Sequence, residues 1–154
     1  MSIKIYTDGG NSAKNKVGGI AAVITKDDEL LTIISEGYDS DPTNNMMELG
    51  AVIAGLEYML NHPELGKTVE IVSDSEYVVL GASERLDKWK AKNWKCSTGP
   101  VKNLPLWKCI DEAKLLLNIT WTWVRGHAGN KFNELADQAA VNSYKTILDA
   151  RKSV

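Results

Sequence analysis

The sequence predicts an α/β fold in which helices cover a mixed β-sheet, and three features of the residue pattern support this fold class. The first part of the chain holds three apolar runs separated by short polar segments, a pattern typical of an antiparallel meander. The apolar period then changes from two to about 3.6 residues, which indicates helices. Two further strand-like runs follow among helical segments, and such alternation predicts a sheet covered by helices.

The predicted meander consists of Ile3–Asp8, Gly19–Thr25 and Leu30–Tyr38. The first of these runs alternates between two unlike sets of side chains, as a strand with two different faces does. We expect the glycines and asparagine at 9–11 to break this strand. We expect the polar residues 26–29 to form the turn between the second and third strands.

The later elements are predicted from helical spacing and from shorter apolar runs. A helix with apolar residues at 49, 52, 53, 56 and 60 ends at Pro63. In chain order it is followed by the strand Val69–Ser73, a helix from Asp74 to about Leu80, a polar stretch Arg85–Lys95, a helix Leu104–Leu117, the strand Ile119–Val124 and a helix from Asn133 to about Leu148. We expect one domain over residues 1–148 and a frayed tail over 149–154.

Composition and charge exclude several classes of protein. With 154 residues, 44% of them hydrophobic and 25% charged, the chain has the composition of a globular domain. Its net charge of −2 excludes a generally basic nucleic-acid binder, so contact with nucleic acid requires a local patch. Cys96 and Cys109 form neither a disulfide framework nor a zinc motif, and we expect reduced thiols in the cytoplasm. No apolar run approaches the ~20 residues that cross a bilayer, so we expect no membrane partner.

Four carboxylates stand near the ends of predicted elements, and each also has a purely structural explanation. Asp8 ends a strand and could be a turn residue, whereas Asp74 could be a helix N-cap. Glu48 follows Asn45 by three residues, the spacing of a capping box. Asp137 could lie on the solvated face of the last helix.

Taken together, these carboxylates predict a metal site, because a sheet covered by helices can bring such element ends to one edge. Carboxylates gathered in this way repel one another unless cations neutralise them. Hard oxygen ligands without cysteine or clustered histidine select Mg²⁺ or Mn²⁺. Two such ions about 4 Å apart can activate a water and stabilise the leaving oxygen of a phosphodiester.

Five sequence blocks carry a resemblance that runs from Ile5 to roughly Ala140. They are Tyr6–Gly10, Thr43–Leu49, Ser73–Val78, Pro100–Asn103 and Trp123–Gly129, the last followed by Asn133, Glu134 and Asp137. In this order and at this spacing they resemble type 1 ribonuclease H, which cleaves the RNA strand of RNA–DNA hybrids. The resemblance implies a ribonuclease H-like fold: a five-stranded mixed sheet, with a three-strand antiparallel meander plus two parallel strands, flanked by helices.

The resemblance also implies a catalytic set and a mechanism. The implied metal ligands are Asp8, Glu48, Asp74 and Asp137, holding two Mg²⁺ ions for which Mn²⁺ can substitute. Hydrolysis of the RNA strand would then leave 5′-phosphate and 3′-hydroxyl ends. His127 matches a loop histidine that helps proton transfer or product release, a role that suits an imidazole with an ordinary pKa of about 6.5. Glu134 matches a residue that supports the metal site, whereas we expect no function for His62.

Contacts to an RNA–DNA hybrid are implied at several positions. They are Asn11, Thr43, Asn44, Asn45, Glu76, Lys88, Trp89, Lys90, Lys92, Lys102 and Asn103. Asn44 and Asn45 match positions that contact the RNA strand, and Thr43 and Asn103 match a pocket that grips a DNA phosphate. The alternative for these small polar residues is turn and capping chemistry, and Asn45 could serve both purposes.

Residues 85–95 resemble the basic protrusion of bacterial members of the family. Five basic residues stand here against Asp87 alone, which supplies the local patch that the overall charge lacks. We expect Trp94 mostly in the core and Trp89 closer to the DNA strand. The alternative is a solvated, lysine-rich helix whose tryptophans are buried.

Three positions depart from the family pattern. Met46 and Asp41 stand where arginine is common, and Glu76 places a negative charge where bacterial relatives often have glutamine. We expect altered substrate affinity or metal optimum, with activity retained. Two other functions stay open from the sequence: another nuclease of similar fold, such as an integrase, transposase or junction resolvase, and a binding module without catalysis. We expect a monomer with no obligate protein partner.

Overall fold

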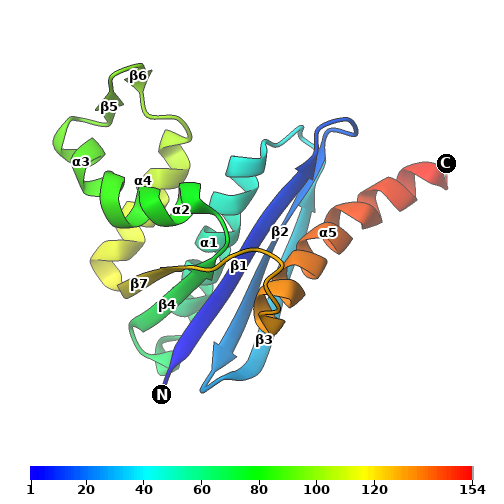
Figure 1. Ribbon diagram of the computed structural model, residues 1–154, viewed down its shortest axis with the longest axis horizontal. Helices are drawn as coiled ribbons and strands as arrows, with labels where there is room; N and C mark the ends of the chain where they lie inside the picture. The colour runs from blue at the N-terminus through cyan, green and yellow to red at the C-terminus, as the bar shows by residue number, and fades with distance from the viewer. Residues whose placement is uncertain (154) are drawn as a thin grey trace.

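The computed structural model describes residues 1–153, and a five-stranded sheet forms its centre (Figure 1). The strands are β1 (Ile3–Ser12), β2 (Val17–Lys26), β3 (Glu29–Tyr38), β4 (Thr68–Ser73) and β7 (Asn118–Trp123), in the order β3-β2-β1-β4-β7. β1, β2 and β3 form an antiparallel meander, β4 pairs in parallel with β1, and β7 pairs in parallel with β4. The predicted fold class is confirmed.

Helices cover both faces of this sheet (Figure 1). They are α1 (Asn44–Asn61), α2 (Glu76–Leu80), α3 (Leu86–Ala91), α4 (Leu104–Leu116) and α5 (Lys131–Lys152), with a 3-10 turn at Pro63–Leu65 and a π-helical turn at Gly81–Arg85. A small hairpin of β5 (Lys95–Cys96) and β6 (Gly99–Pro100) follows α3. Together with α3 it projects to the side of the sheet.

The core consists of three apolar clusters, and the two larger ones lie on opposite faces of the sheet. Neighbouring residues of β1 alternate between them: Ile5 packs with Leu49 of α1 and Trp107 of α4, whereas Tyr6 packs with Ala136 of α5. β2 is buried from Val17 through Thr25, because helices cover both of its faces. The core therefore fixes the exits of β1 and β4 relative to α1 and α5.

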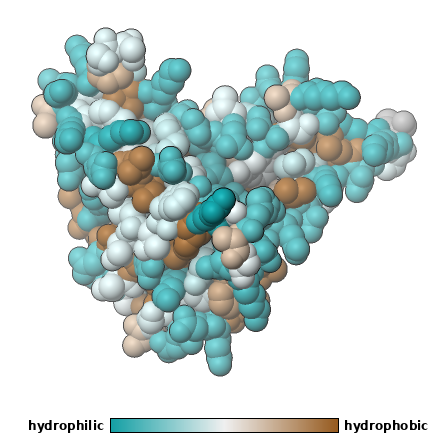
Figure 2. Space-filling model, in the orientation of Figure 1, coloured by the Kyte–Doolittle hydropathy of each residue, from teal (hydrophilic) through white to brown (hydrophobic). Residues whose placement is uncertain are grey.

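Hydrophobic residues also occur on the surface. On the face shown in Figure 2 they lie in separate patches among hydrophilic residues. Within residues 1–153, no helix combines the length and the apolar composition that a bilayer crossing requires.

Two predicted boundaries were wrong. β1 continues through Gly9 and Gly10 to Ser12, because these glycines pair with Ile20 and Gly19 of β2 instead of forming a turn. The last helix begins at Lys131 and continues to Lys152, beyond the predicted end near Leu148. Residues 149–152 of the expected tail are thus helical, and Val154 lies outside the described residues.

The first turns of α1 cross β1 at Gly9, where the two backbones touch. A Cβ atom at Gly9 would overlap the carbonyl group of Met47 and the main-chain nitrogen of Glu48. At the adjacent Gly10 the nearest atom to such a Cβ, Asn44 Oδ1, is 4.0 Å away. Glycine at position 9 is therefore required by the approach of a helix, not by a turn.

We predict that Gly9→Ala destabilises the protein by about 1–3 kcal/mol, because α1 must move away from β1 to admit the methyl group. Gly10→Ala is the matched control, and it should change the free energy of unfolding by less than about 0.5 kcal/mol. Thermal and urea unfolding of both variants would measure the difference. Equal stability of the two variants would contradict the packing described for Gly9.

Candidate metal centre

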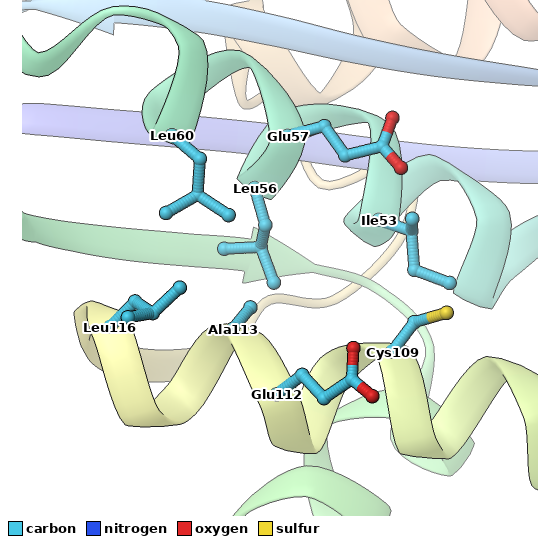
Figure 3. A pocket seen from close by; sticks show the side chains of 8 residues that line it. All are labelled: Ile53, Leu56, Glu57, Leu60, Cys109, Glu112, Ala113 and Leu116. Atoms are coloured by element: carbon cyan, nitrogen blue, oxygen red, sulfur yellow. The ribbon is translucent and has the colours of Figure 1, made fainter.

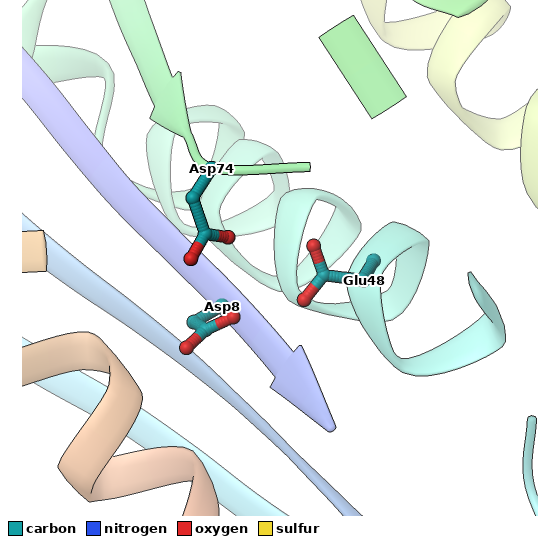
Figure 4. A group of neighbouring side chains, drawn as sticks. All are labelled: Asp8, Glu48 and Asp74. Atoms are coloured by element: carbon teal, nitrogen blue, oxygen red, sulfur yellow. The ribbon is translucent and has the colours of Figure 1, made fainter. Parts of the chain in front are cut away.

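Three carboxylates from three elements meet beside the central strand β1, at the point where β4 ends (Figure 4). Asp8 lies on β1, Glu48 lies near the start of α1, and Asp74 directly follows β4. One oxygen from each lies within 4.8 Å of the others, and their side chains converge on a common point. This group combines residues that are 66 positions apart in the chain.

Strand pairing brings the two aspartates together. β1 and β4 run in parallel with Thr7 opposite Ser73, so Asp74, which directly follows β4, lies beside Asp8, which is still part of β1. Gly9 then joins the third carboxylate to the first. Its N–H donates to Asp8 Oδ1 at 2.9 Å and to Glu48 Oε1 at 2.6 Å. The close crossing of α1 over β1 thus allows one main-chain N–H to bind two of the three carboxylates.

The N-caps of α1 and α2 are hydroxyl side chains, so the nearby carboxylates Glu48 and Asp74 are not used for capping. Thr43 caps α1, with its hydroxyl accepting from the Met46 N–H at 3.2 Å, so the predicted cap at Asn45 was wrong. Ser75 caps α2 by accepting from the Val78 N–H at 3.2 Å, so the alternative role of Asp74 as N-cap was also wrong. In both helices a neighbouring hydroxyl satisfies the first turn.

Burial and like charge dominate the electrostatics of the group. Burial, then hydrogen bonding with Glu48 and the charges around it, raises the pKa of Asp8 well above its usual range. Burial also raises the pKa of Glu48, against the effects of Asp8 and the Gly9 N–H. Burial and the charge of Asp137 raise the pKa of Asp74. Deprotonation of the whole group is therefore costly.

Within the described part of the chain, no salt bridge from lysine or arginine offsets this cost. Among residues 1–153, none of the ion pairs includes Asp8, Glu48, Asp74 or Asp137. Two buried carboxylates and one half-buried carboxylate, with hard oxygen donors and no cysteine or histidine among them, fit a divalent cation of the Mg²⁺ or Mn²⁺ type. The chemistry of this donor set therefore agrees with the metal site that the sequence predicts.

Asp137 and His127 lie around the group without belonging to its tight centre. Asp137, in the second turn of α5, lies near enough to raise the pKa values of Asp8 and Asp74. The charge of His127 lowers the pKa of Asp74. The loop that carries His127 touches the site at Gly126, where a Cβ atom would stand 3.0 Å from Asp74 Oδ2. His127 itself is exposed and has a left-handed backbone, with φ of 56°.

The structure does not join Glu134 to the carboxylates. It is exposed in the first turn of α5 and lines a shallow hollow with Gly129, Lys131 and Gln138. No hydrogen bond among the described residues links it to the metal-binding group.

Most of the predicted substrate residues lie in two segments, one at the start of α1 and one that runs from α3 to the start of α4. Thr43, Asn44 and Asn45 are exposed at the start of α1, and Asn11 Nδ2 donates to the Pro42 carbonyl at 3.0 Å, which ties the end of β1 to this segment. Asn103 is half-buried, and its amide donates to Tyr77 Oη at 3.0 Å.

Tyr77 is a residue that sequence reasoning missed. Its hydroxyl accepts from Asn103 Nδ2 and also from Trp107 Nε1 at 3.1 Å, so it links α2 to the start of α4. Asn103 has a left-handed backbone, with φ of 59°, which this amide bond helps to hold. Only the packing of α2 on α4 brings these groups together, and no local pattern signals it.

In the basic protrusion the lysines are exposed, but not all are free. Lys88 and Lys92 are exposed, whereas Lys90 pairs with Asp111 at 3.0 Å. The two tryptophans are both half-buried against the same core. Trp89 packs edge-on against Trp107 with ring centres 5.2 Å apart, and Trp94 lies beneath Lys108. We expected Trp94 to be more buried than Trp89, but both side chains are half-buried.

A second concave feature lies between α1 and α4 (Figure 3). It has a volume of about 190 Å³ and is lined mainly by aliphatic side chains, among them Leu56, Leu60 and Leu116. Glu57 and Glu112 are its two carboxylates, and none of the metal-binding group lies in it. The carboxylate group is thus the stronger candidate for chemistry.

Comparisons with known proteins agree with this geometry. The family model described as RNase H matches residues 1–145. A protein named Ribonuclease H from Thiobacillus denitrificans is 41% identical over 151 residues, covering 97% of this chain and 96% of the relative. One from Ruthia magnifica is 40% identical over 139 residues, covering 90% of this chain and 92% of the relative. One from Methylorubrum extorquens is 41% identical over 153 residues, and this chain spans 64% of its length.

Solved structures show the same architecture. LC9-RNase H1, described as a type 1 RNase H with the type 2 active-site motif, matches with a TM-score of 0.78 and 28% identity, covering 94% of this chain and 72% of the other. The N-terminal RNase H domain of a Mycobacterium tuberculosis protein matches in fold, with a TM-score of 0.76 and 23% identity, over 97% of this chain and 98% of the other. From the family model and the relatives that match over nearly their whole length, the chain belongs to the ribonuclease H family.

Proposed function

We propose that the protein is an endoribonuclease that cleaves the RNA strand of RNA–DNA hybrids by metal-dependent hydrolysis, leaving 5′-phosphate and 3′-hydroxyl ends. One observation carries the chemistry: oxygens of Asp8, Glu48 and Asp74 lie within 4.8 Å of one another, and no lysine or arginine among residues 1–153 forms a salt bridge with them. Membership of the ribonuclease H family supports the choice of substrate.

The residues proposed to hold the metal are these three carboxylates together with Asp137. Two Mg²⁺ ions, for which Mn²⁺ can substitute, would supply an activated water and would stabilise the leaving oxygen. The protein contributes by fixing the carboxylates before substrate arrives. Gly9 holds two of them through its N–H, and parallel pairing of β1 with β4 holds the third.

His127 and Glu134 are proposed to act around this centre. An exposed imidazole on a loop that already touches Asp74 through Gly126 can accept a proton from the reacting groups and pass it to solvent. The first turn of α5 carries Glu134 three residues before Asp137, on the same helix face, from which it can support that carboxylate.

The hybrid is proposed to lie across the carboxylates, from the start of α1 to the basic protrusion. Thr43, Asn44 and Asn45 offer exposed hydroxyl and amide groups on one side. On the other side, Lys88 and Lys92 offer exposed charge for a phosphate backbone, with Trp89, Lys90, Lys102 and Asn103 nearby in the chain. Glu76 is exposed two residues after Asp74, where its charge opposes the approach of phosphate.

We further propose that the protein acts as a monomer in the bacterial cytoplasm without an obligate protein partner. Its cysteines, Cys96 and Cys109, are both unpaired and exposed, which suits a reducing compartment. The relatives described above are bacterial.

The test is cleavage of end-labelled RNA–DNA hybrid, duplex RNA and duplex DNA, each with Mg²⁺, Mn²⁺ or a chelator. We expect cleavage of the RNA strand of the hybrid alone, and no cleavage with the chelator. Asp8→Asn should lower kcat by more than about 100-fold, because it removes a proposed metal ligand. Cleavage of duplex DNA in preference to hybrid would contradict the proposed substrate. Activity that survives the chelator would contradict the metal mechanism.

The raised pKa of Asp8 leads to a prediction about stability. The folded chain favours protonated Asp8, whereas in the unfolded chain this group ionises near pH 4. Its stabilising contribution is therefore complete below about pH 4 and is lost as the pH rises toward the folded pKa. Asp8→Asn removes this loss, so we expect its Tm without metal to exceed that of the native sequence, increasingly so between about pH 5 and pH 8.

Scanning calorimetry of both proteins over this pH range would measure the effect. Excess Mg²⁺ at the upper end of the range should raise the Tm of the native sequence more than that of Asp8→Asn, since bound cations favour the folded state. A difference in Tm that stays constant with pH would contradict the electrostatic description of the site.

A further inference from the structure

The turn that carries Asp74 is fixed on both of its flanks. The Ser75 N–H donates to Ser73 Oγ at 3.0 Å, and Ser75 Oγ accepts from the Val78 N–H to begin α2. These bonds hold the residues before and after Asp74. The main chain of Asp74 itself is held by a different element, β7.

Trp123, the last residue of β7, makes this contact. Its indole N–H donates to the main-chain carbonyl of Asp74 at 3.1 Å. In the same register, Trp123 lies opposite Ser73, and the Val124 N–H donates to the Ser73 carbonyl at 2.9 Å. The edge strand therefore binds both residues at the exit of β4, one through its backbone and one through a side chain.

The exposure of Trp123 argues against a purely apolar role for its ring. The side chain is 46% exposed, although it is a large aromatic group at the edge of the sheet. With Glu76, Val79 and Leu80 of α2 it lines a hollow of about 230 Å³ beside Asp74. An indole N–H exposed to this degree could bond to water at little cost. The indole N–H therefore does not bond to Asp74 because burial denies it water. It bonds there because the position of Trp123 on β7 directs it at the Asp74 carbonyl.

Asp74 is consequently restrained from two directions. Trp123 of β7 holds the main-chain carbonyl of Asp74. Gly126, three residues after Trp123, lies against the Asp74 carboxylate. A fixed carbonyl limits rotation of the Asp74 backbone, and this rotation would swing the carboxylate away from Asp8 and Glu48. A displacement of about 1 Å in a catalytic group is enough to reduce the rate substantially.

We propose that Trp123 is a positioning residue, whose indole N–H keeps the Asp74 carboxylate aimed at the metal position between Asp8 and Glu48. The proposal rests on the function proposed above for this site. It assigns Trp123 no contact with substrate or metal, since its action passes through the main chain of Asp74.

The test uses Trp123→Phe, which keeps an aromatic ring beside α2 and removes the N–H donor. The matched control is Trp121→Phe, the same change two residues earlier on β7, where the half-buried ring packs against the apolar core. Mg²⁺ affinity is measured by calorimetry on each protein without nucleic acid. Values of kcat and KM are then measured on the RNA–DNA hybrid, and thermal unfolding shows that each variant is folded.

For Trp123→Phe we expect Mg²⁺ affinity and kcat each to fall about five-fold, the loss of one neutral hydrogen bond, with KM unchanged. Higher Mg²⁺ should restore part of kcat. For Trp121→Phe we expect a lower Tm, with native Mg²⁺ affinity and kcat, because a partly buried ring is reduced in size.

Native Mg²⁺ affinity and kcat in Trp123→Phe would overturn the proposal. A rise in KM alone would also overturn it, because the indole would then be a substrate contact. Equal losses of Mg²⁺ affinity in both variants would assign the effect to general loosening of β7. A native protein that binds Mg²⁺ without cleaving the hybrid would contradict the proposed function and leave the calorimetric test of Trp123 valid.

Discussion

The crossing of α1 over β1 at Gly9 is the contact on which the rest of the site depends. It places Glu48 where the Gly9 N–H can reach both its carboxylate and that of Asp8. Any side chain at position 9 would overlap the α1 backbone at Met47. Glu48 therefore reaches Asp8 only because Gly9 has no side chain to keep α1 away from β1.

This contact gathers carboxylates whose negative charges are not neutralised by lysine or arginine side chains within residues 1–153. Burial raises the pKa values of Asp8, Glu48 and Asp74, and no lysine or arginine among the described residues pairs with them. A rigid frame thus holds three mutually repelling groups. Such an arrangement disfavours the folded state without a cation and favours tight binding of one, which couples metal affinity to the stability of the fold.

Much of this site could be predicted from sequence, because its main parts follow from regular structure. Asp8 and Asp74 each follow an apolar run of the sequence, and parallel pairing of the strands that these runs form brings the two side by side. The five blocks that resemble ribonuclease H also include Glu48 and are followed by Asp137, and both residues lie near Asp8 in the structure. Periodicity and the ends of apolar runs are local patterns, so they can be recognised in the sequence before the fold is known.

The parts that could not be predicted depend on contacts between distant segments. Gly9 was interpreted as a strand break, because local pattern cannot distinguish a glycine needed by a turn from one needed by a crossing helix. The cap of α1 was assigned to Asn45 although Thr43 makes it, since several neighbouring residues are good caps. The bond from Trp123 to Asp74 depends on the register of β7 on β4, which the sequence does not specify.

The central claim is that Asp8, Glu48 and Asp74 form a cation site built by the fold before substrate binds. Crystals of the protein soaked in Mn²⁺ without nucleic acid would test it most directly, through the anomalous scattering of the metal. The account predicts a manganese peak ligated by oxygens of these three residues at about 2.2 Å. A peak elsewhere, or none at this position with Mn²⁺ in excess, would contradict it.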